Sequence, residues 1–333
     1  MDNKLRIVRL MSDGAFHSGE VLAESCGISR AAVWKHLKQI EIQFRLKIHS
    51  VRGRGYRLSS RLDLLDSAKI LSLLSGDMRQ RIPVPDVLLQ VDSTNRHLAQ
   101  KAGAGLPSDV SCFAEQQTAG RGRRGREWVS PFGNNIYMSI YRKLNIDITA
   151  IGGLSLGVGI ACVEALSGLG VTGIGLKWPN DILFDERKLA GILIEVTGEQ
   201  GGAASIVVGI GVNTRMDPVE AKAIDQPWCD LAEIGTNQEL SRNLLAARLL
   251  EGAVRVLDRF EQYGFSPMRD HWNRYDIYLG KRIVLLQGVK SISGIHRGVN
   301  EQGALLLECE GPVVPFHGGE LSLRQTVENR RGG

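Results

Sequence analysis

A chain of 333 residues, with 43% hydrophobic and 23% charged residues, is long enough for two or three domains and close to average globular composition. This excludes a short peptide, a wholly disordered chain and a collagen-like or coiled-coil rod. The formal net charge is +5, and residues 1–60 carry 11 of the 41 Lys and Arg but 5 of the 36 Asp and Glu. The positive excess therefore lies in an N-terminal module, which predicts contact with a polyanion there.

Targeting and redox signals indicate a cytoplasmic protein without a membrane partner. The opening MDNKLRIVRLMSDG has no apolar core and no cleavage site of a signal peptide. The weakly polar stretch 150–166 is short and broken by four glycines, so we expect no membrane span. The cysteines are odd in number and form no CxxC pair, which disfavours disulfides and structural zinc: Cys26, Cys112, Cys162, Cys229 and Cys309.

Three short helices are expected in the N-terminal module. The first ends at Ser12-Asp13-Gly14, and the second runs from the N-cap Ser18 to the breaker Gly27. The third is capped by Ser29 and carries an apolar stripe of Val33, Leu37 and Ile40. Two helices joined at a glycine turn are typical of a helix-turn-helix.

The polar face of the third helix is suited to DNA. We expect the base- and phosphate-contacting residues to be Ser29, Arg30, Ala31, Trp34, Lys35 and Lys38. The following residues, 46–58, predict a strand, a Gly53-Arg54-Gly55 turn and a second strand, a hairpin wing that adds Arg54 to the DNA-binding set. The alternative is a protein-interaction module with a solvated basic face.

The body alternates strand-like and helix-like segments. A Leu-rich helical stretch is expected at 63–75, helices at 94–101 and 151–167, and strands at 87–91, 110–114, 136–141, 175–178, 189–196 and 205–212. Strands outnumber helices and several follow one another directly. This favours an α+β fold whose sheet carries helices on one face.

The densest chemistry lies in GRGRRGREW, residues 120–128. It satisfies GxGxxG, but a Rossmann fold needs a helix directly afterwards, and here Trp128 to Gly133 breaks the chain. RGG-type RNA binding is disfavoured because the single copy lies between two apolar strands. Four arginines on a glycine-rich loop predict a cationic flap that closes over a phosphate. A solvated basic loop is the alternative.

Three further polar segments each end a predicted strand or begin one. DSTN at 92–95 caps a helix, KWPND at 177–181 makes a stiff turn, and KLAGILIE at 188–195 opens a strand with a lysine among apolar residues. Each pattern alone is structural more often than functional. Their combination makes Lys188 a candidate point charge for a phosphate.

These segments, with SPFGNNIYMS at 130–139 and GIGVN at 209–213, resemble the biotin protein ligase family of the bifunctional type, the biotin operon repressors. SRAAVWKHL at 29–37 and RGVNEQGALLLE at 297–308 extend the resemblance over essentially the whole chain. It implies an α+β protein in three domains: a winged helix-turn-helix (1–62), a mixed-sheet catalytic domain of the biotin/lipoate ligase type (63–276) and a C-terminal SH3-like β-barrel (277–327). We expect the tail, 328–333, to be disordered.

The resemblance also implies the reaction. Biotin and ATP give biotinyl-5′-AMP with Mg²⁺ present, and a lysine of the biotin carrier protein of acetyl-CoA carboxylase then takes the biotinyl group. The implied catalytic residues are Lys188, Arg123 and Asp181. The implied biotin-binding residues are Ser93, Thr94, Asn95, Gln117, Arg121, Gly122, Arg123 and Lys188. The implied adenylate-binding residues are Arg123, Trp128, Asn180 and Asn213. No metal ligand on the chain is assigned.

The helix-turn-helix adds repression to what the resemblance implies. Biotinyl-5′-AMP would act as corepressor, promoting a homodimer that binds a two-half-site operator. Two alternatives remain open at this point: a lipoate or octanoate ligase of the same fold, and a ligand-sensing regulator without catalysis. The GRGRRGREW loop argues against the first alternative, and Lys188 together with the C-terminal domain argues against the second.

Overall fold

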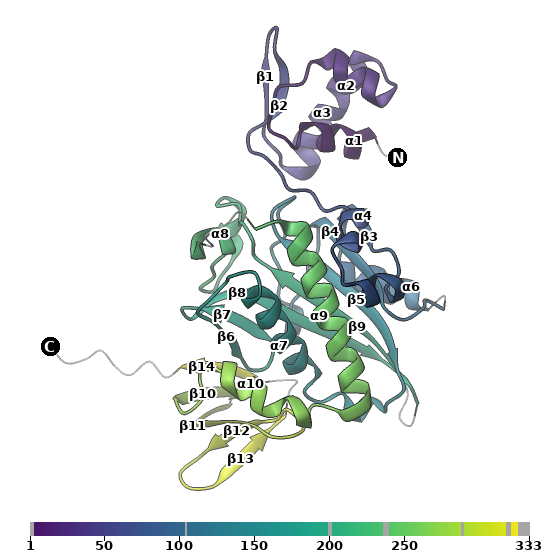
Figure 1. The fold of residues 1–333 in the computed structure, drawn as a ribbon. Helices are drawn as coiled ribbons and strands as arrows, with labels where there is room; N and C mark the ends of the chain where they lie inside the picture. Colours follow the sequence, from purple (N-terminus) through teal and green to yellow (C-terminus); the bar gives the residue numbers. More distant parts are fainter. Residues whose placement is uncertain are drawn as a thin grey trace, which may run out of the picture.

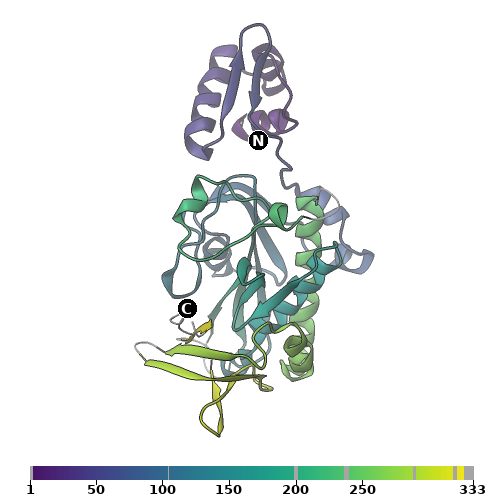
Figure 2. The ribbon, with the colours of Figure 1, turned by 90° about the vertical axis from the view of Figure 1, so that its left-hand side faces the viewer.

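The computed structural model describes residues 3–103, 105–198, 202–235, 240–287, 290–317 and 321–325. These residues form a helical N-terminal lobe, a central sheet covered by helices and a C-terminal sheet, which confirms the predicted α+β class (Figure 1). The N-terminal lobe and the C-terminal sheet lie at opposite ends of the central lobe (Figure 1 and Figure 2). The predicted disordered tail, 328–333, lies outside the described residues.

The N-terminal lobe is the predicted winged helix-turn-helix. It consists of α1 (Asn3–Met11), α2 (Gly19–Cys26), α3 (Arg30–Phe44), β1 (Ile48–Val51) and β2 (Gly55–Leu58). The side chain of Ser18 accepts from Val21 N–H and caps α2, while Ser29 accepts from Ala32 N–H and caps α3. The predicted stripe on α3 is buried, together with Phe44.

The hairpin turn of this lobe needs its glycines. Gly53 and Gly55 both have positive φ. A Cβ on Gly55 would lie 2.0 Å from the carbonyl oxygen of His17, because β2 passes directly beside the start of α2. The turn is therefore fixed against the helical core.

The central sheet has seven strands in the order β3-β4-β5-β9-β8-β7-β6, in which β3 and β4 are parallel and the other neighbouring pairs are antiparallel. The strands are β3 (Asp86–Val91), β4 (Val110–Gln117), β5 (Ile136–Leu144), β6 (Ile174–Lys177), β7 (Asp181–Phe184), β8 (Arg187–Thr197) and β9 (Ala204–Val212). Alternate residues of β9 face opposite sides of the sheet, with Ile206, Val208 and Ile210 in the main apolar core. Val207 belongs to a smaller cluster on the other face.

Helices cover both faces of this sheet, so the expectation of helices on one face is wrong. The helical segments are α4 (Ser67–Ser72), α5 (Gly76–Arg81), α6 (Thr94–Ala102), η1 (Arg123–Gly125), η2 (Ile148–Ile151), α7 (Leu154–Ser167), η3 (Glu220–Ala223), α8 (Leu231–Ile234), α9 (Arg242–Tyr263), η4 (Ser266–Met268) and α10 (Arg269–Tyr275). α7 and α9 pack over the main core. α6 lies on the opposite face, where Leu98 packs beside Val207 and Cys112.

Several expected boundaries are corrected by the structure. The Leu-rich stretch at 63–75 forms α4, capped by Asp66, and α5 then follows from Gly76 instead of one continuous helix. The helix expected from residue 151 begins at Leu154, because Gly153 has a φ of 81°. β7 and the long α9 were not expected.

Residues 148–167, which join η2 and α7, are apolar and long enough by composition to cross a bilayer, and half of this segment is buried inside the protein. α7 packs against α9 so closely that a Cβ on Gly252 would contact the Cβ of Ala161 at 3.3 Å. The apolar composition of α7 is therefore explained by its place in the core.

The C-terminal lobe is a five-stranded antiparallel sheet in the order β13-β12-β11-β10-β14, which confirms that this domain is all-β as predicted. The strands are β10 (Arg282–Gln287), β11 (Lys290–Val299), β12 (Leu305–Glu308), β13 (Val313–Phe316) and β14 (Leu321–Gln325). The pairing of β11 with β12 is irregular between His296 and Val299, where such a bulge bends a sheet.

The N-terminal lobe packs on the central lobe through the end of α3. Phe44 stacks on Phe132 with ring centroids 4.5 Å apart. Gln43 Nε2 donates to Gln90 Oε1 on β3 at 2.9 Å. Leu62 lies beside Gly133, and Phe132 and Leu62 belong to the apolar core of the N-terminal lobe.

Candidate active site

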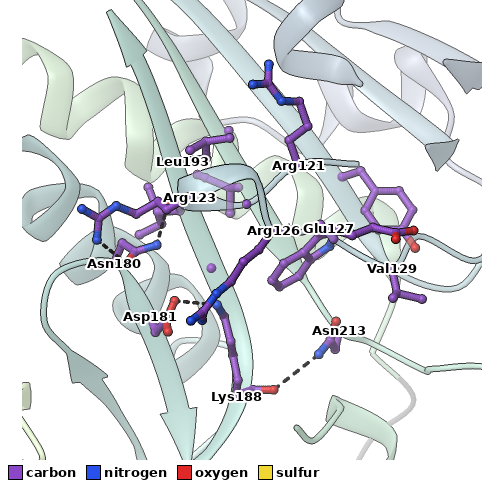
Figure 3. Close-up of a pocket in the computed structure, with 18 of the residues that line it drawn as sticks. Arg121, Arg123, Arg126, Glu127, Val129, Asn180, Asp181, Lys188, Leu193 and Asn213 are labelled. Atoms are coloured by element: carbon purple, nitrogen blue, oxygen red, sulfur yellow. Dashed lines mark hydrogen bonds and ion pairs between the residues drawn. The ribbon is translucent and has the colours of Figure 1, made fainter. Parts of the chain in front are cut away.

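One cavity of about 300 Å³ opens on the face of the central sheet that carries α6. Its walls come from the β3–α6 junction, the cationic loop 120–128, the β6–β7 turn and the strands β8 and β9 (Figure 3). All twelve ligase-site residues expected from the sequence line it: Ser93, Thr94, Asn95, Gln117, Arg121, Gly122, Arg123, Trp128, Asn180, Asp181, Lys188 and Asn213. Segments up to 120 residues apart in the chain therefore meet at one site.

Glycines on β9 make room for this site. Gly209 and Gly211 lie two residues apart and line the cavity. A Cβ on Gly209 would lie 2.3 Å from Asn95 Oδ1, and a Cβ on Gly211 would lie 2.6 Å from the indole of Trp128. Any other residue at either position would push these side chains out of place.

One end of the cavity is lined by neutral polar groups. Gln117 Oε1 accepts from Thr94 N–H at 2.9 Å and from Thr94 Oγ1 at 3.2 Å. Ser139 Oγ lies 2.7 Å from Thr94 Oγ1 and donates to Asn95 Oδ1 at 2.6 Å. Because each group is bonded, their orientations are fixed before a ligand arrives.

Ser93 is the N-cap residue of α6, but its side chain makes no capping bond. Asp92 Oδ1 accepts from Ser93 N–H at 2.6 Å and Asp92 Oδ2 pairs with Arg96. The capping role considered for the whole DSTN segment therefore does not extend to the Ser93 hydroxyl, which is buried at the cavity.

Glu195 connects this neutral end to the start of the cationic loop. Its carboxylate accepts from Asn95 Nδ2 at 3.0 Å and from Arg121 Nη1 at 3.2 Å. The loop also closes on itself, since Trp128 N–H donates to Gly120 O at 2.9 Å. Glu195 belongs to the matched KLAGILIE segment but was not expected to contact the site.

The opposite end carries the charged groups. Lys188 Nζ lies 2.7 Å from Asp181 Oδ1, and Arg123 Nη1 donates to Asn180 Oδ1 at 3.4 Å (Figure 3). Asn180 Nδ2 donates in turn to the backbone oxygen of Ile192 at 2.9 Å. Burial, followed by the neighbouring Arg124, lowers the pKa of the Arg123 guanidinium from its ordinary value. Arginine remains charged throughout the physiological range.

The KWPND segment is the tight connection of a β-hairpin. Lys177 on β6 pairs with Asp181 on β7, so Trp178, Pro179 and Asn180 form the turn between them. The hairpin places Asn180 and Asp181 at the edge of the cavity that faces β8. Two residues adjacent in sequence therefore contact two different cations: Asn180 contacts Arg123 and Asp181 contacts Lys188.

Trp128 and Asn213 both lie close to Lys188. Lys188 Nζ lies 5.4 Å from the centroid of the Trp128 ring, within cation–π range. Asn213 Nδ2 donates to the backbone oxygens of Cys229 at 3.1 Å and Lys188 at 3.4 Å. Asn213 thus holds the segment around residue 229 against the start of β8.

Several lining residues were not expected from the sequence. Arg126 extends from the loop into the cavity beside Lys188 (Figure 3). A second wall comes from the stretch after β9, whose lining members are Met216, Ala223, Ile224, Asp225, Gln226 and Trp228. The arginine-rich composition of the loop was a signal for Arg126, whereas the second wall has no recognisable local motif.

The DNA-binding residues expected on α3 are exposed together. Arg30, Ala31, Trp34, Lys35 and Lys38 lie on the side of α3 away from the lobe's core, with Ser29 exposed at its start. Arg54 lies at the tip of the wing, and its guanidinium stacks over the ring of Phe16 at 4.3 Å. This face and the cavity are separate, and no α3 residue lines the cavity.

The fold and the site define a class of protein. A Biotin/lipoate A/B protein ligase family model matches residues 87–213, an HTH domain model matches 3–57 and a Biotin protein ligase C terminal domain model matches 278–324. The chain is 44% identical over 320 residues to the bifunctional ligase/repressor BirA of Escherichia coli K12, covering 96% of this chain and 97% of that protein. The chain belongs to this family of bifunctional biotin protein ligases.

Other relatives cover the catalytic part. A biotin–[acetyl-CoA-carboxylase] ligase of Paracoccus denitrificans is 36% identical over 254 residues, which are 70% of this chain and 100% of that protein. The solved structure of the Aquifex aeolicus biotin protein ligase in complex with biotin and ATP is 30% identical, with a TM-score of 0.62, and covers 73% of this chain and 99% of that chain.

Proposed function

We propose that this protein is an ATP-dependent ligase that activates biotin as biotinyl-5′-AMP and transfers biotin to a lysine of the biotin carrier protein of acetyl-CoA carboxylase. One observation carries the proposal. A single cavity joins a neutral end of fixed hydrogen-bonding groups to an end lined by more cations than anions. A ureido ring needs paired donors and acceptors, whereas a carboxylate beside a triphosphate needs positive charge.

In the first step an oxygen of the biotin carboxylate attacks the α-phosphorus of ATP, and the bond to the bridging oxygen breaks to release pyrophosphate. Two anions must approach, so positive charge fixed in advance lowers the barrier. The cations that line the cavity are Arg121, Arg123, Arg124, Arg126, Lys177 and Lys188. We assign the carboxylate and α-phosphate to Arg123 and Lys188, and a second phosphate contact to Asn180.

In this proposal, the neutral end holds the bicyclic ring of biotin and the other wall holds the adenylate. Ser93, Thr94, Asn95, Gln117 and the backbone of Arg121 to Arg123 bind the ring. Trp128 packs on the adenylate, and Asn213 lies near the adenine. The observed bonds of Thr94 and Asn95 support this division, because they leave those side chains fixed and facing the cavity.

In the second step the carrier lysine attacks the acyl carbon and AMP leaves. The attacking amine must be neutral and must lose a proton as the amide forms. Asp181 Oδ1 lies 2.7 Å from Lys188 Nζ at the charged end of the cavity. We assign Asp181 the orientation or deprotonation of the carrier lysine's amine. The cationic loop keeps water from the acyl phosphate, which would otherwise hydrolyse.

Mg²⁺ enters this proposal with the nucleotide. Among the described residues, no three His, Cys, Asp or Glu side chains gather in a way that would hold a metal ion. Mg²⁺ commonly binds through one or two carboxylates together with substrate phosphates, so a site without a cluster of protein ligands is compatible with this ion. The ion would offset phosphate charge, and no residue of the chain is assigned to it as a dedicated ligand.

Biotin-dependent ATP–pyrophosphate exchange tests the enzyme activity. The purified chain, with Mg²⁺ present, is expected to exchange labelled pyrophosphate into ATP with biotin and not with lipoate or octanoate. Exchange with lipoate or octanoate alone would contradict the biotin assignment. A folded protein without exchange on any of the three acids would support a ligand sensor.

We also propose that the protein represses transcription of biotin-synthesis genes, with biotinyl-5′-AMP as corepressor. The exposed cationic face of α3 and the wing supports DNA binding, and a homodimer formed with biotinyl-5′-AMP would match an operator of two half-sites. The cytoplasm is the compartment in which ATP, the carrier protein and DNA meet. The proposal places the boundary between the DNA-binding and catalytic domains at residues 62/63, and the boundary between the catalytic and C-terminal domains at residues 276/277.

Replacing Lys35 by alanine is expected to weaken operator binding and leave biotin-dependent exchange unchanged. Lys35 is exposed on α3, so the loss of one phosphate contact should lower the slope of log K against log salt by about 1. Fluorescence anisotropy with a duplex selected from random-sequence DNA measures this effect. Lys101→Ala, which removes an exposed lysine on α6, is the control. An unchanged salt slope for Lys35→Ala would exclude this residue from the DNA contact.

A further inference from the structure

The hairpin turn that carries Asn180 and Asp181 is held from outside the catalytic lobe. The indole of Trp178 is buried, and its Nε1–H donates to the backbone oxygen of Gly303 in the C-terminal lobe at 3.0 Å. On the other side of Lys177, the backbone oxygen of Leu176 accepts from Ile277 N–H at 3.1 Å. The residues on both sides of Lys177 are therefore attached to the C-terminal part of the chain.

A buried hydrogen bond between two side chains fixes the segment that makes the second attachment. His296 on β11 and Asp276, the residue after α10, both have fully buried side chains, and His296 Nε2 lies 2.5 Å from Asp276 Oδ2. Asp276 Oδ1 also accepts from Tyr278 N–H at 2.9 Å. The backbone of His296 bonds to Gly280 and Lys281, at 2.8 and 2.9 Å. His296 thus binds residues 276–281 at several points.

The joint between this segment and β6 leaves no space for small displacements. A Cβ on Gly175 would lie 2.2 Å from the side chain of Ile277. A Cβ on Gly303 would lie 2.5 Å from the Cα of Gly153 at the start of α7. Tightly packed contacts of this kind transmit a shift of one element to the next. A displacement at residues 276–277 would reach Leu176, and with it the start of the turn.

We propose that His296 and Asp276 are positioning residues for the ligase reaction. Neither residue lines the cavity, and they hold the β6–β7 turn so that Asn180 faces Arg123 and Asp181 faces Lys188. The inference rests on the proposed function and extends it, because it assigns a role in the chemical step to a pair located in the joint with the C-terminal lobe. The neutral end of the cavity, around Thr94 and Gln117, is formed by segments other than this joint.

The test compares kinetics with binding in the full-length protein. His296→Leu removes the bond to Asp276, and we expect kcat for biotin-dependent pyrophosphate exchange to fall by about tenfold or more, because small misplacements of reacting groups carry large rate penalties. The Kd of biotin, measured by calorimetry, should stay within about twofold, since the neutral end is formed by other segments. His296→Gln keeps an N–H directed at Asp276 and should recover most of the rate. Arg297 is on β11 next to His296 in sequence, and Arg297→Gln, which removes a partly exposed ion pair with Glu308 on β12, is the matched control.

A second variant keeps the inference testable if His296→Leu does not fold. Trp178→Phe removes the N–H bond to Gly303 together with part of the buried ring, and it should likewise lower kcat and spare the Kd of biotin. If His296→Leu and Trp178→Phe lower the melting temperature but leave kcat and the KM for ATP unchanged, the two attachments are structural and the inference is wrong. If the wild-type protein shows no exchange, the proposed function fails, and this inference fails with it.

Discussion

Replacement of Lys188 by alanine is expected to lower the rate of biotin-dependent pyrophosphate exchange by about 10²–10³-fold, the range found when one preorganised electrostatic group is removed from an active site. Lys188 Nζ is largely shielded from water, 2.7 Å from Asp181 and within reach of the Trp128 ring. A cation in such a site stabilises developing phosphate charge more strongly than a cation in bulk water. The backbone of Lys188, bonded to Pro227 and Cys229, is unaffected, so the fold should persist.

A double variant separates two explanations of that loss. Lys188→Ala also leaves Asp181 without its cation, and the unpaired carboxylate could itself repel the substrates. If Lys188→Ala/Asp181→Asn remains as slow as Lys188→Ala, the lysine acts directly on the reacting groups. Recovery of exchange in the double variant would show that Lys188 only neutralises Asp181. Full activity of Lys188→Ala alone would remove this residue from the mechanism.

Replacement of Glu115 by alanine is expected to destabilise the protein by about 3–5 kcal/mol, the usual cost of removing one partner from a buried ion pair. Glu115 and Arg242 are both buried, and Arg242 Nη1 donates to Glu115 Oε2 at 2.9 Å. Glu115 Oε1 also accepts from Leu65 N–H at 2.6 Å. Removing the carboxylate therefore leaves a guanidinium charge and a backbone donor buried without this partner.

Urea denaturation followed by circular dichroism measures this effect on the central lobe. Lys101→Ala, which breaks an exposed pair with Asp86, serves as the control and should cost at most about 1 kcal/mol. A loss for Glu115→Ala no larger than that of the control would mean that water or a shifted side chain replaces the carboxylate. The effect is expected on stability, because Glu115 and Arg242 do not line the cavity.

Local signals in the sequence predicted the N-terminal lobe closely. Ser18 and Ser29 cap their helices, and the stripe on α3 is buried, because capping and amphipathic spacing are properties of short segments. The motifs also predicted which residues share the cavity. That prediction came from the family resemblance, since no local rule brings Thr94 and Lys188 together.

Features that depend on distant contacts were missed or misplaced. α9 was not expected, although Leu245, Leu249 and Leu257 recur at helical spacing along its buried face. β7 is four residues long and is stabilised by pairing with β6 and β8, which a single segment does not reveal. The second wall of the cavity depends on Asn213 holding the main chain near Cys229, a contact between residues 16 apart.

The packing of the end of α3 against Phe132 limits how this protein could be shortened. Residues 3–62 bury Phe132 and partly bury Leu64 and Leu89. A truncated ligase that begins after residue 62 would present these apolar side chains to solvent in one patch beside the first strand of the sheet, and such patches promote self-association. Replacing Phe132 by a polar residue in the shortened protein should restore its solubility. The DNA-binding lobe therefore also shields the catalytic lobe from aggregation.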